Sequence, residues 1–269
     1  MTTISNPSDQ YWFLYSRFLG LPAPFPAFLV LGSSAVYLLL VYVIWPTMKP
    51  TTEAGIRMCK NLRFYHNVAL FLFSAFVFFT TAVYLFQEGE LLSQTKIACN
   101  PIPDWMFTLQ VLFILSKVWE WGDTMFLVLL RPAKEKSFLH VYHHTTTTWL
   151  FIIMTDFPGG VKSGLLMNGF VHALMYAHYA WPFPKPLVPF ITGSQIIQLM
   201  SGMYLWSITP GTCPRFAAFP SDHFFEYVSF YAFTPVYLIF FVHFFAQRWV
   251  FGGARKRTGG APKDSKAEE

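Results

Sequence analysis

Three histidines lie within five consecutive residues, at His140, His143 and His144. Side chains three and four positions apart share one face of a helix, so a helix here would gather the three imidazoles into an arc of about 100°. Two kinds of chemistry use such a group. Neutral imidazoles are good ligands for a metal ion, and an imidazole can also act directly as a nucleophile or general base. The residues alone leave both chemistries open.

A second cluster places charges of both signs in an apolar stretch. Lys117 and Glu120 lie three residues apart and can form an ion pair on a helix, with Thr124 on the same face. Asp123 is a second carboxylate close to the first. Two interpretations stay open: an ion pair that only fixes helix packing, or a shell that orients the groups of a site. Two carboxylates beside one lysine leave a partner to be found, and a histidine is a candidate.

A third stretch carries polar groups along one helical face. Asn168, His172, Met175 and Tyr176 share that face if the segment is helical. His172 is therefore a site candidate with Asn168 and Tyr176 beside it. His178 lies about 120° from this stripe, which is typical of a packing or interfacial residue.

Polar residues also recur at every third position in Thr192, Gln195 and Gln198. Hydrogen bonding between helices in a membrane is one explanation, and contact with a substrate is the other. The isolated histidines are left out of the predicted site, namely His66, His223 and His243.

The elements that must position these residues are apolar. Of the 269 residues, 54% are hydrophobic and 12% are charged, whereas an ordinary soluble domain carries about 25% charged residues. The net charge of +5 is small and scattered, unlike the concentrated basic surface of a nucleic-acid-binding protein. We therefore expect an all-α integral membrane protein.

Seven segments reach or approach the length of about 20 apolar residues that a bilayer span requires. They are 26–45, 67–86, 105–130, 139–155, 162–181, 187–207 and 224–246. Together they form one predicted membrane domain over residues 1–251. The remaining tail, 252–269, contains Gly, Lys and Arg and is expected to be disordered and cytosolic.

The distribution of Lys and Arg predicts the orientation, because these residues concentrate in cytosolic loops. With seven spans, fourteen of them fall on the side of the C-terminus and four on the side of the N-terminus. The N-terminus should then be outside the cytosol and the C-terminus inside it. His140 would lie at the cytosolic mouth of the fourth span.

The cysteines fall on both sides of this predicted membrane. Cys99 and Cys213 share the non-cytosolic side, where disulfides persist. A bridge between them and two unpaired cysteines are equally compatible with the spacing. Cys59, on the cytosolic side, should be free.

Four motifs, one on each of four consecutive segments, resemble the signatures of the fatty acid elongase family. They are Lys117-x-x-Glu120-x-x-Asp123-Thr124, His140-x-x-His143-His144, Asn168-x-x-x-His172-x-x-Met175-Tyr176 and Thr192-x-x-Gln195-x-x-Gln198. The resemblance implies seven transmembrane helices, six of which form a ring around a narrow acyl tunnel. It also implies a multi-pass protein of the endoplasmic reticulum membrane, with a lumenal N-terminus and a cytosolic C-terminus.

The activity that the resemblance implies is the condensation of a long-chain acyl-CoA with malonyl-CoA, giving 3-ketoacyl-CoA, CO2 and CoA. No metal or organic cofactor is expected, since both CoA thioesters are substrates. The family favours a covalent route in which His143 attacks the thioester and holds the acyl group as an acyl-imidazole. His172 would assist or share the acyl group, and His140 and His144 would complete the site. The expected orienting residues are Lys117, Glu120, Asp123, Asn168, Tyr176, Gln195 and Gln198.

The partners implied by the resemblance follow from the substrates. CoA is polyanionic and requires basic groups at the cytosolic mouth, for which Arg131, Lys134 and Lys136 are candidates. Membrane lipid, acyl-CoA, malonyl-CoA and the reductases and dehydratase of the elongation cycle are expected partners. Nucleic acid is not expected, and homo-oligomer formation stays open. Two positions depart from the family pattern: His178 replaces a common tyrosine, and Glu135 replaces the glutamine of many polyunsaturated-selective members.

Two other functions compete with this interpretation. A di-iron membrane desaturase or hydroxylase uses several histidine boxes, whereas this chain has eight histidines but one box. A seven-span transporter or receptor would account for charges within the membrane. It gives no reason for three clustered imidazoles near a helix that carries Lys, Glu and Asp.

Overall fold

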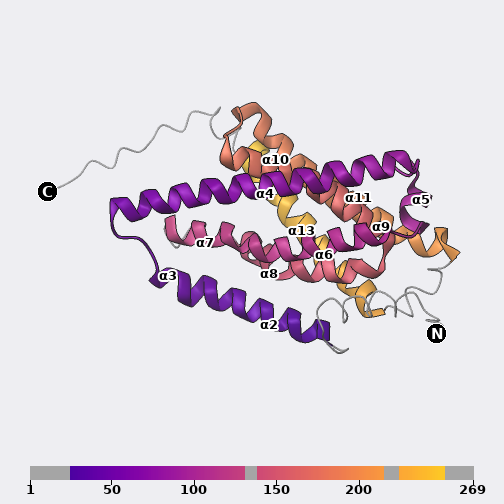
Figure 1. The fold of residues 1–269 in the computed structure, drawn as a ribbon, viewed down its shortest axis with the longest axis horizontal. Helices are drawn as coiled ribbons and strands as arrows, with labels where there is room; N and C mark the ends of the chain where they lie inside the picture. The colour runs from indigo at the N-terminus through magenta and orange to yellow at the C-terminus, as the bar shows by residue number, and fades with distance from the viewer. Residues whose placement is uncertain (1–24, 131–137, 215–223, 252–269) are drawn as a thin grey trace.

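The computed structural model describes residues 25–130, 138–214 and 224–251. Within these ranges the chain is helical and has no β-strand, so the expected all-α class is confirmed. Apolar segments favour helices because a helix satisfies its backbone hydrogen bonds within one segment. The helices pack side by side into an elongated bundle (Figure 1).

The first part of the described chain consists of α2 (Phe25–Leu39), the π-helical η1 (Leu40–Ile44), α3 (Trp45–Thr47), α4 (Glu53–Gln87), α5 (Gln94–Cys99), α6 (Asp104–Trp119) and α7 (Trp121–Leu130). The second part consists of α8 (Phe138–Ile153), the short η3 (Met154–Asp156), α9 (Pro158–Ser163), the π-helical η4 (Gly164–Asn168), α10 (Gly169–Ala180), η5 (Lys185–Leu187), α11 (Val188–Thr212), α13 (Phe224–Phe245) and η7 (Ala246–Phe251).

Each of the seven predicted apolar segments lies on helix, but several are not one continuous α-helix, including 26–45, which contains the π-helical η1. The segment 105–130 is split into α6 and α7 at Glu120. The segment 162–181 contains the π-helical turn η4, which ends at Asn168. Both breaks fall at polar residues of the predicted site, and π-helical turns within α-helices are frequent at functional sites.

Among the described residues, two helices are long and apolar enough to cross a membrane by length and composition. These are Glu53–Gln87 and Phe230–Phe251, and the apolar helix Gly32–Thr47 is shorter. The break at Glu120 explains why the segment 105–130 falls short, because α6 has 16 residues and α7 has 10, whereas a span needs about 20.

Helix α4 begins well before the apolar segment predicted at 67–86. The side chain of Thr52 accepts a hydrogen bond from the Gly55 backbone N–H at 3.1 Å, a contact that caps the helix at its start. Most of the first predicted cytosolic loop is therefore helical. A hydropathy pattern detects only the apolar part of a helix, so the polar first turns of α4 gave no signal.

Helices α4 and α10 pack closely along each other (Figure 1). Gly169, the first residue of α10, lies against the backbone of α4. A Cβ atom added there would be 3.1 Å from the backbone nitrogen of Phe78 and 3.3 Å from the carbonyl oxygen of Ser74. Glycine is favoured at this contact, because a Cβ atom would force the backbone of α4 to shift.

One end of the bundle is closed by α5, α9 and the C-terminal part of α11, which contact one another. Cys99 and Cys213 form a disulfide with Cα atoms 5.4 Å apart. The buried Nζ of Lys162 lies 2.6 Å from Glu90 Oε2 and donates to the Asn100 carbonyl at 2.9 Å. A covalent bond and a buried ion pair thus fix the same end.

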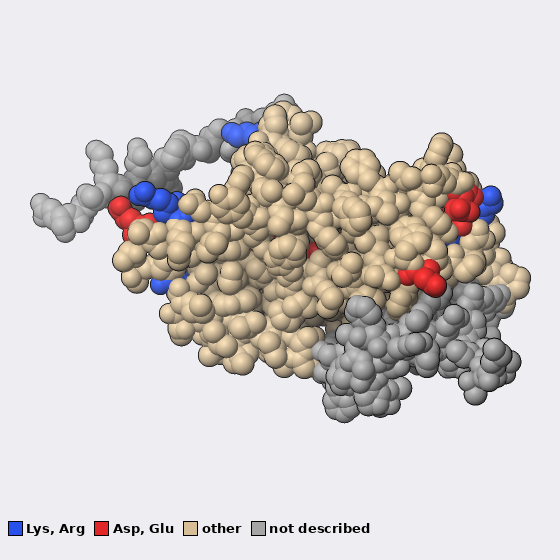
Figure 2. Space-filling model, viewed as in Figure 1, with Lys and Arg blue, Asp and Glu red and all other residues tan. Residues whose placement is uncertain are grey.

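The outer surface is largely apolar. Charged side chains gather toward the two ends of the face shown in Figure 2, and the surface between them is almost entirely uncharged. Phe79, in the middle of α4, is 63% exposed. A broad exposed apolar surface is rare on soluble monomers and is suited to contact with lipid.

Candidate active site

Lys117, on the last turn of α6, is buried between two oxygen acceptors. Its Nζ donates to Glu120 Oε1 at 2.7 Å and to Asn168 Oδ1 at 2.8 Å. His172 Nδ1 lies 3.2 Å from the same oxygen of Glu120. Each of these four residues is at most 5% exposed. The predicted ion pair therefore forms, and it belongs to a network that joins α6 to η4 and α10.

The position of Glu120 affects the chemistry of His172. A carboxylate beside Nδ1 favours the tautomer that carries its proton on Nδ1. The other nitrogen of His172, Nε2, then keeps its lone pair and can accept a proton or bond to carbon. The orienting role predicted for Glu120 stays a prediction, because the two atoms are close but do not meet hydrogen-bond geometry.

Asp123, in the first turn of α7, contacts side chains from two other helices. Its Oδ1 lies 3.0 Å from His66 Nε2, and its Oδ2 accepts a hydrogen bond from the Tyr176 hydroxyl at 2.6 Å. Gly122 makes room for this contact, because a Cβ atom there would lie 2.5 Å from His66 Cε1. His66 is thus the histidine partner that the second carboxylate required.

Sequence reasoning missed His66, which it had set aside as an isolated histidine. The unpaired carboxylate was visible in the sequence, but His66 is 57 residues from Asp123 and belongs to no motif. The sequence indicated that one carboxylate lacked a partner, but it did not indicate which of the isolated histidines would supply it.

The three clustered histidines have different surroundings. His140 Nε2 lies 2.9 Å from Thr124 Oγ1, which is 2.8 Å from the hydroxyl of Tyr37. His144 packs beside Tyr37 with ring centroids 6.3 Å apart. The centroids of His140 and His144 are 4.6 Å apart. These two histidines therefore pack toward α7 and α2.

His143 lies on the side of this arc that is nearest α13, with its ring centroid 5.3 Å from that of His144. Its ring centroid is 5.4 Å from that of Tyr237. Within the described part of the chain, the His143 ring makes no hydrogen bond, while its carbonyl accepts one from Thr147 Oγ1 at 2.5 Å. Thr145 and Thr146 bond to carbonyls four residues earlier in the same way, so the backbone that carries the histidines is fixed from both sides of the helix.

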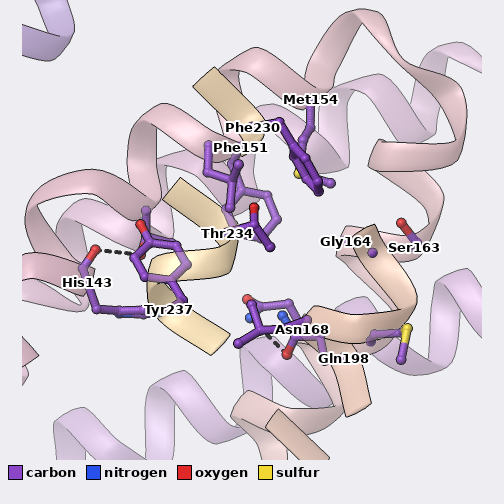
Figure 3. A pocket seen from close by; sticks show the side chains of 15 residues that line it. His143, Phe151, Met154, Ser163, Gly164, Asn168, Gln198, Phe230, Thr234 and Tyr237 are labelled. Atoms are coloured by element: carbon purple, nitrogen blue, oxygen red, sulfur yellow. Dashed lines mark hydrogen bonds between the residues drawn. The ribbon is translucent and has the colours of Figure 1, made fainter. Parts of the chain in front are cut away.

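His143 lines a cavity of about 60 Å³ between α8, η4, α11 and α13 (Figure 3). Polar side chains line one part of it: Asn168 Nδ2 donates to Gln198 Oε1 at 3.4 Å. Apolar side chains, including Met154 and Phe230, line another part. Along α8 and into the first residue of η3, the lining residues extend from His143 to Met154, a rise of about 16 Å at 1.5 Å per residue.

Some predicted site residues lie outside this cavity. His172 is not part of its lining but is connected to it through Glu120, Lys117 and Asn168. Gln195 is also absent from the lining, and its Nε2 lies 4.0 Å from Met175 Sδ. The polar residues of α11 are therefore divided: Gln198 reaches the cavity, and Gln195 contacts α10.

The remaining predictions concern other positions. His178 has the expected packing role, since its Nδ1 accepts the Phe183 N–H at 2.9 Å just after α10. Cys59 is free and buried. Among the described residues, no group of three His, Cys, Asp or Glu side chains is arranged to hold a metal ion. Outside the described residues lie the tail 252–269 and the CoA candidates Arg131, Lys134 and Lys136.

Known proteins share this sequence pattern. Residues 26–257 match the family described as ELO: GNS1/SUR4 family. The chain is 26% identical over 207 residues to very long chain fatty acid elongase 5 of Tachysurus fulvidraco, covering 74% of this chain and 66% of that protein. It is 31% identical over 162 residues to fatty acid elongase 6 of Leishmania major, covering 59% and 40%. It is 27% identical over 260 residues to very long chain fatty acid elongase 5 of Mus musculus, covering 91% and 79%. The aligned region thus spans from less than half to about four fifths of these relatives.

Proposed function

This chain belongs to the ELO family, described as the GNS1/SUR4 family, and on that basis we propose that it is the condensing enzyme of a fatty acid elongation cycle. Its relatives are named as fatty acid elongases, which supports elongation as the general function. The proposed reaction joins a long-chain acyl-CoA with malonyl-CoA and yields 3-ketoacyl-CoA, CO2 and CoA.

The observation that carries this proposal is the position of His143. Its ring, without a hydrogen bond in the described structure, borders a cavity that is polar near Asn168 and Gln198 and apolar near Met154 and Phe230. A thioester fits the polar part and the start of an acyl chain fits the apolar part. The volume of about 60 Å³ is smaller than a long acyl chain, so its entry requires flexible side chains such as Met154 to move.

The first half-reaction transfers the acyl group to the enzyme. A nitrogen of His143 attacks the carbonyl carbon of the thioester, the C–S bond breaks, and CoA leaves as a thiolate that takes up the imidazole proton. The acyl group remains bound to His143 as an acyl-imidazole. His172, oriented by Glu120 at 3.2 Å, would assist this transfer or share the acyl group.

The second half-reaction forms the new carbon–carbon bond. Malonyl-CoA loses CO2, and the electron pair left on its C2 attacks the held acyl carbon. The C–N bond to His143 breaks, and the imidazole regains a proton from solvent. Each turn extends the acyl chain by two carbons, and no oxidant or reductant is needed.

The proposed setting is a multi-pass protein of the endoplasmic reticulum membrane with a lumenal N-terminus. Seven spans, six of them in a ring around the acyl tunnel, would place His143 toward the cytosol and the closed end in the lumen. The disulfide between Cys99 and Cys213 supports this orientation, because disulfides persist in oxidising compartments. Arg131, Lys134 and Lys136 are the proposed contacts for the CoA phosphates, and the enzymes of the later elongation steps are the proposed partners.

The test is an elongation assay in microsomes from a host that expresses the chain. We expect labelled malonyl-CoA to be incorporated into a 3-ketoacyl product two carbons longer than the added acyl-CoA. His143→Ala should abolish this incorporation, while His243→Ala should preserve it, since His243 is exposed. Incorporation that survives His143→Ala would contradict the proposal, as would stoichiometric iron with oxygen-dependent activity.

A further inference from the structure

Thr234, on α13, has a buried hydroxyl that no described residue satisfies. The residue is 2% exposed, and within the described part of the chain its Oγ1 has no hydrogen-bond partner. Thr234 lines the same cavity as His143 (Figure 3). Buried polar groups are nearly always hydrogen-bonded, so an unsatisfied hydroxyl that borders a cavity indicates a partner that enters the cavity.

The other polar side chains around the cavity already have partners. Thr147 donates to the His143 carbonyl, Ser163 donates to the Gly160 carbonyl, and Tyr237 bonds to Thr146. Asn168 is held between Lys117 and Gln198. Gln198 uses its carbonyl oxygen in that contact, and no described residue accepts a hydrogen bond from its amide nitrogen. Apart from His143 itself, Thr234 and Gln198 are therefore lining residues whose donor groups have no described acceptor and can donate to a molecule in the cavity.

The backbone of α13 does not explain the free hydroxyl. A threonine inside a helix commonly bonds to the carbonyl four residues earlier, as Thr145, Thr146 and Thr147 all do. Thr234 does not make this bond to Phe230. The Thr234 hydroxyl can therefore donate to a molecule in the cavity, whereas the hydroxyls of the three α8 threonines are bonded to their own helix.

The position of Thr234 relative to His143 suits contact with the reacting carbonyl. Tyr237 packs against the His143 ring at 5.4 Å between centroids. Thr234 precedes Tyr237 by three residues, so it lies on the same face of α13, about 4.5 Å along the helix axis. An acyl group bound to His143 would pass this position as it enters the cavity.

We propose that Thr234 is a catalytic residue that donates a hydrogen bond from its hydroxyl to the carbonyl oxygen of the acyl group on His143, with the Gln198 amide as the second donor. This inference rests on the proposed function. Negative charge develops on that oxygen when His143 attacks the thioester and again when C2 of malonyl-CoA attacks the acyl-imidazole. Donors fixed in advance around such an oxygen stabilise both tetrahedral intermediates.

Three variants test this role. Thr234→Val keeps the shape of the side chain and removes the hydroxyl, Thr234→Ser keeps the hydroxyl, and Thr148→Val is the matched control. Thr148 is also buried with an unpartnered hydroxyl, but it does not line the cavity. The rates to measure are CoA release from acyl-CoA alone and extension with malonyl-CoA, together with KM for acyl-CoA and the thermal midpoint.

Loss of one such donor typically lowers kcat by about 10²–10³-fold, and we expect this for Thr234→Val in both half-reactions, with little change in KM. Thr234→Ser should recover most of the rate, and Thr148→Val should match the wild type. Wild-type rates for Thr234→Val would overturn the inference, and so would a Thr234→Ser variant as slow as Thr234→Val. A wild-type chain that neither releases CoA nor extends acyl-CoA would instead overturn the proposed function, and the inference with it.

Discussion

Glu120 and Asp123 are three residues apart, yet they belong to separate hydrogen-bond networks. Glu120 contacts Lys117 and His172, and Asp123 contacts His66 and Tyr176. Each buried carboxylate thus has its own histidine. Each carboxylate needs a partner of its own, because a buried carboxylate without one would be strongly destabilising. Among the described residues, His143 belongs to neither network.

His66 should act as a positioning residue. In His66→Phe, Asp123 loses one of its two partners, while aromatic packing against Phe126, at 5.4 Å in the wild type, can be kept. Loss of the partner that orients a metal-ligating side chain typically reduces activity by about 10–100-fold, and we expect a comparable fall in kcat at this site, for which no metal is proposed, in the microsomal assay.

The control for His66→Phe is a conservative substitution that should restore part of the activity. His66→Gln can still donate to Asp123 and should recover part of the rate, whereas His243→Phe should have no effect because that side chain is exposed. Full activity in His66→Phe would show that the contact with Asp123 is only structural packing.

The sequence predicted those site residues that recur at helical spacing and failed for the others. Lys117 and Glu120 were expected on one face and do form an ion pair, while Asn168 and His172 join the same network through Lys117 and Glu120. His66 and Thr234 lie in no motif, and each acquires its role from a helix that is distant in sequence. Spacing along one helix cannot indicate which residue of another helix will face it.

At the scale of elements, the site lies where helices are interrupted. The turn at Glu120 separates α6 from α7, and the π-helical η4 ends at Asn168. These breaks bring Glu120, Lys117 and Asn168 together between helices that are otherwise regular. Gly169 follows directly and allows α10 to approach α4, so the position of His172 depends on that contact.

Gly169→Ala tests this contact. The added Cβ would lie 3.1 Å from backbone of α4, so the helices must separate, at a cost of about 1–3 kcal/mol for overpacking. The thermal midpoint in detergent should fall, and activity should fall with it because His172 shifts. Gly193→Ala is the control, since no atom lies within 4 Å of its added Cβ. Equal midpoints for the two variants would contradict the close packing.

Hydropathy predicted where helices occur better than where they begin and end. All seven predicted segments are helical in the described structure, but α4 starts at Glu53 and several segments are interrupted. The polar first turns of α4 and the internal breaks have little effect on average hydropathy. The start of α4 is capped by Thr52. The residues at the internal breaks have side-chain partners on other helices.

At the scale of the whole molecule, one end of the bundle is fixed, and the cavity extends from His143 toward that end. The disulfide closes a loop across a sequence separation of 114 residues, and Lys162 with Glu90 adds a buried ion pair at the same end. His143 lies at the far end of the cavity from Met154, on the side away from this closed end. The arrangement suits a tunnel that is entered from one side only.

Replacement of Cys99 and Cys213 by serine should weaken the whole bundle. Removal of a native disulfide typically costs about 2–5 kcal/mol, so we expect a lower thermal midpoint for the double variant, with the cavity chemistry preserved in the folded fraction. Cys59→Ser is the control, because Cys59 is free. The bridge would be disproved if Cys99 and Cys213 react with a thiol reagent in unfolded, unreduced wild-type protein.

The most direct test of the acyl-imidazole is intact-mass analysis of the purified protein after incubation with acyl-CoA and without malonyl-CoA. We predict a mass increase equal to one acyl group, release of one equivalent of CoA, and loss of both in His143→Ala. Addition of malonyl-CoA should remove the adduct and yield the extended product. Turnover by the wild type with CoA release but no adduct, under conditions in which acyl-imidazoles survive, would contradict the covalent role of His143.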